Sequence, residues 1–209
     1  MGFEESALER LRRYRKEADL SLGLAREAEE RARRFSERLF AGLEYTAALA
    51  REAGFESESA HERGAFALRV CAGPGSKAQA TFGLVGGAAA ETDEDLVHED
   101  LSSYSLDPSG YSGRILGFSE QVGEDPCQVF AIYRDGVWRT KGLFVERARG
   151  SVDDPDEVLN GFCLRILGRL IDLSVPTRGA GRRWAEQRPY ALVDLMEGRG
   201  FPTETRWFK

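Results

Sequence analysis

The first fifty residues carry apolar and small side chains at alternating spacings of three and four residues. A 3.5-residue repeat of this kind is typical of helices that pack along a narrow apolar stripe. The series runs without a change of phase and without a proline. We therefore predict helix over residues 3–53. The members of the series are Ala7, Leu11, Tyr14, Ala18, Ser21, Ala25, Ala28, Ala32, Phe35, Leu39, Gly42, Thr46, Leu49 and Ala53.

Two features of this segment favour different arrangements. Gly23 follows Asp19 and Ser21, and residues of these types cap or weaken helices, which favours a break there. The unbroken phase favours one helix instead. Because the stripe is wide and rich in alanine, we expect a helical hairpin or bundle that also mediates self-association, with a dimeric coiled coil as the alternative. The predicted oligomer contacts are Leu11, Tyr14, Phe35, Leu39 and Leu49.

After Gly54 the pattern becomes that of β-strands. Strands are predicted at 65–71 and 79–85, at 127–134 and 137–147, and at 114–122. No strand–helix–strand alternation occurs, so we expect a mainly antiparallel sheet of about five strands. Asp135-Gly136 suits a two-residue type I′ turn, which would place Tyr133 opposite Trp138.

A closing helix is predicted after residues 151–155, where acidic residues and Pro155 are typical of a helix start. Gly161 and Gly168 lie in this helix and are candidates for a close approach to another backbone. A short C-terminal helix is expected at 189–197. The fold class is therefore α+β, with residues 1–55 as a helical oligomerisation segment and residues 56–209 as an α+β domain with a C-terminal tail.

Charge and composition limit the classes of partner. The net charge is −6, and residues 56–150 hold the whole excess, with 9 basic against 15 acidic side chains. Nucleic-acid binders usually present a basic face, so this balance argues against them. The chain lacks a run of 18 apolar residues and begins with charged residues, so we expect a cytoplasmic protein without a membrane partner. Cys71, Cys127 and Cys163 are far apart, which argues against a disulfide framework or a zinc site.

One acidic segment is a candidate metal site. Residues 91–100 concentrate carboxylates and an imidazole, which are ligands for Mg²⁺, Mn²⁺ or Ca²⁺. Such ligands normally come from separate elements, and a charge run is more often a solvated loop. We therefore expect no bound metal here. The candidate ligands are Asp93, Asp95, His98, Glu99 and Asp100.

A second candidate lies in the glycine- and arginine-rich stretch 175–184. Arginines bind anions through paired donors, and an indole stacks on a base or nucleotide. The stretch lacks the lysine of a phosphate-binding loop, so a basic linker is the simpler interpretation. The candidate binding residues are Arg178, Arg182, Arg183 and Trp184.

The sequence contains no recognised catalytic motif, which favours an interaction protein without a cofactor. In the leading hypothesis, the helices assemble a homo-oligomer and the acidic α+β domain binds a protein or a small molecule. The first alternative is a metal-dependent enzyme acting on a phosphate-containing substrate, with the 91–100 carboxylates as ligands. The second is nucleic-acid binding through the arginine-rich segments.

Overall fold

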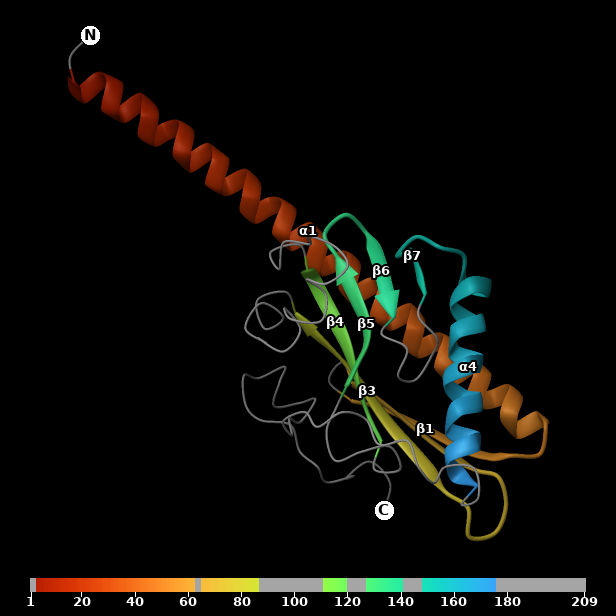
Figure 1. The fold of residues 1–209 in the computed structure, drawn as a ribbon. Helices are drawn as coiled ribbons and strands as arrows, with labels where there is room; N and C mark the ends of the chain where they lie inside the picture. Colours follow the sequence, from red (N-terminus) through yellow and green to blue (C-terminus); the bar gives the residue numbers. More distant parts are fainter. Residues whose placement is uncertain (1–2, 63–64, 87–110, 120–126, 141–147, 176–209) are drawn as a thin grey trace.

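The computed structural model describes residues 3–62, 65–86, 111–119, 127–140 and 148–175 (Figure 1). Two helices lie against one antiparallel sheet, and the first helix extends far beyond it. The elements are α1 (Phe3–Glu52), β1 (Glu56–Glu62), β2 (Ala65–Cys71), β3 (Ala78–Gly86), β4 (Tyr111–Phe118), β5 (Cys127–Tyr133), β6 (Val137–Thr140), β7 (Arg149–Ser151) and α4 (Asp156–Ser174). The α+β class is confirmed.

The N-terminal helix is continuous over 50 residues, so the predicted helical hairpin is wrong. Gly23 lies inside it, and no heavy atom outside the helix's own backbone lies within 4 Å of the position its Cβ would take. A glycine costs an exposed helix about 1 kcal/mol relative to alanine, which weakens the helix without ending it. The uninterrupted phase of the apolar series was therefore the more reliable signal.

The described part of the sheet has seven strands, whereas about five were predicted. Their order follows the chain from β1 to β7, and all six neighbouring pairs are antiparallel. The two unpredicted strands lie at the two edges. β1 carries glutamates and lacks an apolar alternation, and charged side chains are typical of edges that avoid pairing with other chains. β7 has only three residues, too few to show a period.

The β5–β6 hairpin has a different register from the predicted one. Trp138 lies opposite Ile132, because the loop contains residues 134–136 and not the two-residue turn. The Gly136 N–H donates to the carbonyl of Tyr133 at 3.0 Å, and Gly136 has a φ of +84°. A three-residue loop with its last residue in the left-handed region is a common hairpin connection. Tyr133 and Trp138 consequently lie on opposite faces of the sheet, and the predicted pairing is wrong.

The core lies between one face of the sheet and the two helices, and Trp138 is at its centre. The Trp138 ring centroid is 4.9 Å from that of Phe162 on α4 and 5.5 Å from that of Phe130 on β5. On the helix side it stacks on Phe35, at 6.2 Å. Its Nε1 donates to the Ser151 carbonyl at 2.8 Å, which satisfies the one polar atom of the indole. This cluster joins α1, β5, β6 and α4 into one body.

The closing helix packs across α1, but the close contact is not at the glycines that were expected. A Cβ at Gly161 or Gly168 of α4 would meet no atom within 4 Å, so neither forms the close approach. Gly42 of α1 does: a Cβ there would lie 2.8 Å from both Asn160 Oδ1 and Cys163 Sγ. The predicted C-terminal helix at 189–197 lies outside the described residues.

Candidate interaction surface on the projecting helix

The structure separates the predicted oligomer contacts into two groups. Phe35 and Leu39 are buried in the core of their own chain. They therefore stabilise the fold and are not free to contact a second chain. Leu11 is 61% exposed, Tyr14 47% and Leu49 41%.

The other predicted site residues cannot be placed. The candidate metal ligands Asp93, Asp95, His98, Glu99 and Asp100 lie outside the described residues, as do the candidate binding residues Arg178, Arg182, Arg183 and Trp184. Within the described ranges, no three His, Cys, Asp or Glu side chains are grouped so that they could hold a metal ion.

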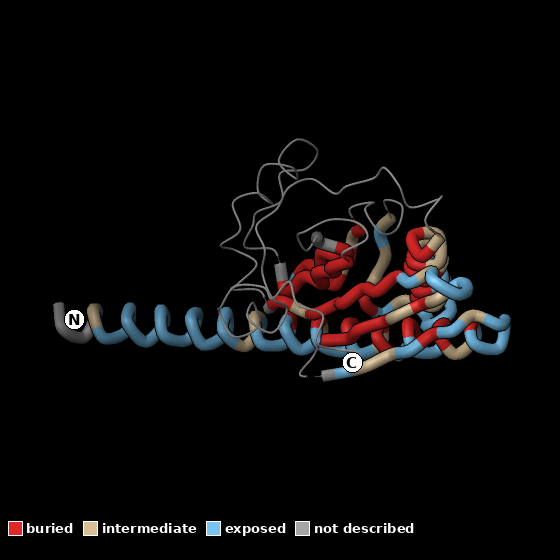
Figure 2. Tube along the Cα trace, turned by 90° about the horizontal axis from the view of Figure 1, so that it is seen from below, coloured by how far each residue is buried: buried red, intermediate tan, exposed pale blue. Residues whose placement is uncertain are grey.

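The first half of α1 projects away from the sheet and from α4 (Figure 1). We call residues 3–27 the arm and the remaining described residues the body. At 1.5 Å per residue the arm is about 37 Å long. From residue 6 to residue 27 each side chain is exposed or half-buried, and the first fully buried residue is Ala28 (Figure 2).

One face of α1 runs through both the arm and the body. From Ala28 to Thr46 this face is buried in the body and includes Ala32, Phe35 and Leu39. Because α1 is unbroken and the 3-4 spacing keeps its phase, the same face continues along the arm. There it consists of Ala7, Leu11, Tyr14, Ala18, Ser21 and Ala25, which we call the arm stripe. Apolar residues that would be core in the body are thus open to solvent on the arm.

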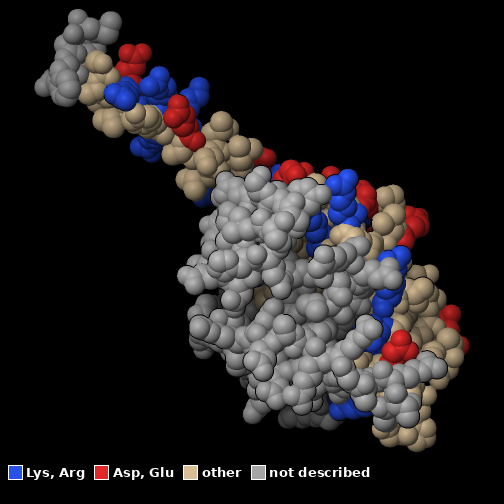
Figure 3. All heavy atoms as spheres, viewed as in Figure 1, with Lys and Arg blue, Asp and Glu red and all other residues tan. Residues whose placement is uncertain are grey.

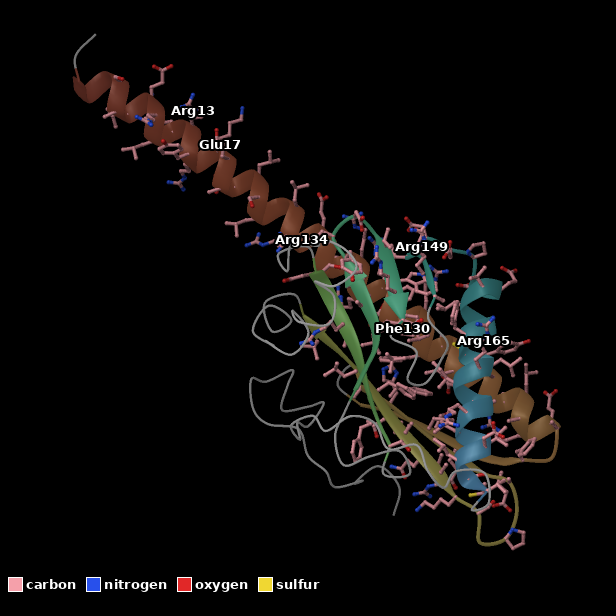
Figure 4. All side chains as sticks on the ribbon, viewed as in Figure 1. Arg13, Glu17, Phe130, Arg134, Arg149 and Arg165 are labelled. Carbon is pink, nitrogen blue, oxygen red and sulfur yellow. The ribbon has the colours of Figure 1, made fainter. Side chains whose placement is uncertain are left out.

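Charged residues of both signs lie on the face of the arm seen in Figure 3. Arg13 Nε lies 3.9 Å from Glu17 Oε1, one helical turn along (Figure 4). Arg10 Nε donates to the Tyr14 hydroxyl at 2.9 Å. Such exposed contacts are each worth less than about 1 kcal/mol. They support the helix but cover little of the stripe.

Arginines fix the base of the arm to the body. Arg31 donates through Nη2 to the carbonyl of Arg134, in the β5–β6 loop, at 3.0 Å. Two turns further along α1, Arg38 donates to the Val152 carbonyl at 2.6 Å and binds the carboxylate of Asp156. The direction in which the arm leaves the body is therefore held by hydrogen bonds as well as by the apolar core.

The sheet face remote from α1 has a feature that the sequence pattern did not reveal. Arg69, Arg114 and Arg139 come from three different strands. Arg114 and Arg139 both lie opposite Ala131, one on each side of β5. Arg69 Nη1 pairs with Glu58 at 2.9 Å, and the Arg139 guanidinium lies 5.3 Å from the centroid of the Tyr133 ring. Only the strand register could have revealed that Arg114 and Arg139 flank the same residue; Arg69 lies opposite Gln79, well away from them along the sheet.

The thiol of Cys163 gives no sign of a reactive site. Cys163 is fully buried, and burial raises the pKa of its thiol to about 12. It donates to the Leu39 carbonyl at 3.5 Å. A nucleophilic cysteine needs the opposite, a lowered pKa and access to solvent. Cys163 is therefore a packing residue.

No helix within the described ranges is long and apolar enough to cross a membrane. The comparisons with protein-family models, with curated proteins and with solved structures found no match to this chain. The arm is consequently the candidate site on the evidence of its own geometry.

Proposed function

We propose that this chain is a non-enzymatic interaction protein that self-associates through its arm. The observation that carries the proposal is the continuity of one helix face. It is buried from Ala28 to Thr46, yet on the arm it leaves Leu11 and Tyr14 about half exposed or more.

The energetics of an isolated helix support a partner for the arm. Helices in proteins gain most of their stability from packing an apolar face, and in water an unpacked helix is marginal. The arm makes no such packing within the described chain and contains Gly23. A second helix along the stripe would supply the missing burial, at about 25 cal/mol for each Å² of apolar surface.

A second proposed interaction involves the α+β domain. Residues 56–150 hold the acidic excess of the chain, most of it in stretches outside the described residues. We propose that the α+β domain, residues 56–209, binds a protein or small-molecule partner of its own. Self-association through the arm would then bring two such bodies together, as in an adaptor. The described residues offer no further observation for a metal-dependent enzyme or for nucleic-acid binding.

The decisive experiment measures the mass in solution of stripe variants. Light scattering coupled to size exclusion should give a mass above 23.2 kDa for the full chain at micromolar concentration. Leu11→Glu should return the mass to that of one chain, because it places a charge in the apolar contact. Lys16→Gln changes the net charge by the same amount on the opposite side of the helix and should leave the mass unchanged.

A monomeric full-length chain would refute the proposal. So would an oligomer that Leu11→Glu and Tyr14→Glu leave intact, because its contact would lie elsewhere. Both residues are exposed and far from the core, so neither variant should prevent folding. Circular dichroism of the variants checks this directly.

A further inference from the structure

The residues that border the arm stripe differ on its two sides. One edge carries Arg10, Glu17 and Leu24, and the other carries Leu8, Arg15 and Leu22, each set with a seven-residue spacing. In a coiled coil these are the positions that contact the partner beside the apolar layers, and their charges set its orientation. The borders therefore discriminate between ways of pairing two arms.

A parallel in-register pair is disfavoured by its borders. In that orientation, each residue of the first edge meets the residue five positions further along the partner helix. Arg10 of each copy then faces Arg15 of the other, which makes two like-charge contacts. Glu17 faces Leu22 and gains no ion pair. No border contact in the parallel pair is attractive.

An antiparallel pair has a register in which the borders attract. Its apolar layers match Leu11 with Tyr14 and Ala7 with Ala18 of the second copy. The first edges of the two helices then lie together, so that Arg10 of each copy meets Glu17 of the other. Arg15 lies against Leu8, where the arginine's aliphatic stem packs on an apolar residue. The pair has two ion pairs and no like-charge contact.

Sliding the antiparallel pair by one heptad removes this advantage. In that register Glu17 meets Glu17 of the second copy, and Arg15 meets Arg15. A single exposed border pair contributes little to the stability of a dimer. However, the first register has two attractive border contacts and the shifted register has two repulsive ones. The borders therefore favour the first register.

We propose that two copies pair their arms antiparallel, with Arg10 of each bound to Glu17 of the other. This inference rests on the proposed self-association and adds its orientation and register. The pair is centred between residues 12 and 13, so the first buried residue, Ala28, lies about 23 Å from the centre on each side. The two bodies are therefore held at opposite ends of the paired arms, with their Ala28 positions about 45 Å apart.

Charge reversal gives a test whose sign depends on the orientation. Arg10→Glu places a carboxylate against Glu17 of the second copy and should raise the dimer Kd at least tenfold. Glu17→Arg should do the same by opposing two arginines. A mixture of the two variants restores both ion pairs, so heterodimers should form with a Kd near that of the wild type. Arg12→Glu makes the same change of charge away from the stripe and serves as the control.

The alternatives give different results. In a parallel pair, the new carboxylate of Arg10→Glu would face Arg15 and tighten the dimer, which would overturn the inference while leaving self-association intact. Dimers whose two bodies lie side by side in small-angle X-ray scattering would do the same. A wild-type chain that stays monomeric would refute both proposals. A Kd that none of the border variants changes would refute the register alone.

Discussion

The Cβ position of Gly42 on α1 lies 2.8 Å from the Sγ atom of Cys163 on α4. A Cβ there would overlap both this buried sulfur and the side-chain oxygen of Asn160, so alanine would require these side chains to shift at the point where the two helices touch. We predict that Gly42→Ala lowers the free energy of unfolding by about 1–3 kcal/mol. Chemical denaturation measures it.

The control for this prediction lies on the other helix. Gly161→Ala and Gly168→Ala place a methyl group where no atom lies within 4 Å, inside helix α4. Alanine favours helix over glycine by up to about 1 kcal/mol, so both variants should be more stable than the wild type. A Gly42→Ala variant that is also more stable than the wild type would contradict a close contact between the helices at this position.

Two leucines on α1 should respond very differently to truncation. Leu39 is completely buried, whereas Leu20, on the arm, is 66% exposed. Leu39→Ala is expected to cost about 2–5 kcal/mol of stability, and Leu20→Ala no more than about 0.5 kcal/mol. Thermal unfolding of the two variants checks the contrast. Equal losses would contradict the placement of the body at the C-terminal half of α1.

The thiol of Cys163 makes stability depend on alkaline pH. Its pKa is raised by burial from 9.0 to about 12, so the folded state keeps a proton that the unfolded state loses. The stability that the protonated thiol contributes is complete below pH 9 and is lost progressively between pH 9 and 12. By about pH 10.5 the loss is about 2 kcal/mol, at roughly 1.36 kcal/mol per pH unit.

The measurement compares how steeply the unfolding free energy falls with pH in the wild type and in a variant. Cys163→Ala removes the titrating group but leaves all others in place. Its unfolding free energy should therefore fall less steeply than that of the wild type between about pH 9 and 10.5. Parallel curves would mean that the thiolate of Cys163 is solvated in the folded state.

Arg38 is expected to be the most sensitive arginine of α1. Arg38→Met leaves the Val152 carbonyl without its donor and removes the pair with Asp156, which should cost about 1–3 kcal/mol. Asp156→Asn should cost less than about 1 kcal/mol, because that carboxylate is 72% exposed. A loss for Asp156→Asn as large as that for Arg38→Met would show that the ion pair, and not the backbone contact, dominates.

The sequence predicted the elements whose period is long or whose composition is typical. The 3-4 series located α1, and apolar residues at helical spacing from Val158 to Ile171 located α4. β1 was missed because its inward residues are polar: Ser57 donates to the Ala47 carbonyl, and His61 packs against Phe40. Because both residues are polar, β1 shows no alternation of apolar and polar positions.

The candidate site was only partly predictable for a related reason. Periodicity identified the stripe that contains Leu11, Phe35 and Leu39, but it cannot tell which stretch of a stripe the chain covers itself. That depends on where the sheet and α4 lie against α1. The hairpin register failed because Asp135-Gly136 suits two loop lengths, and the core position of Trp138 decides between them.

The order of the sheet has a consequence for folding. Since every strand pairs with the strands next to it in sequence, the sheet can be built by adding one strand at a time. The helices cannot follow that rule, because α1 comes before the sheet, α4 comes after it, and the core needs both. During synthesis, Leu39 therefore stays without its α4 partner, Cys163, until α4 has been made. A chain truncated before α4 would keep this apolar face uncovered, and we expect such fragments to aggregate.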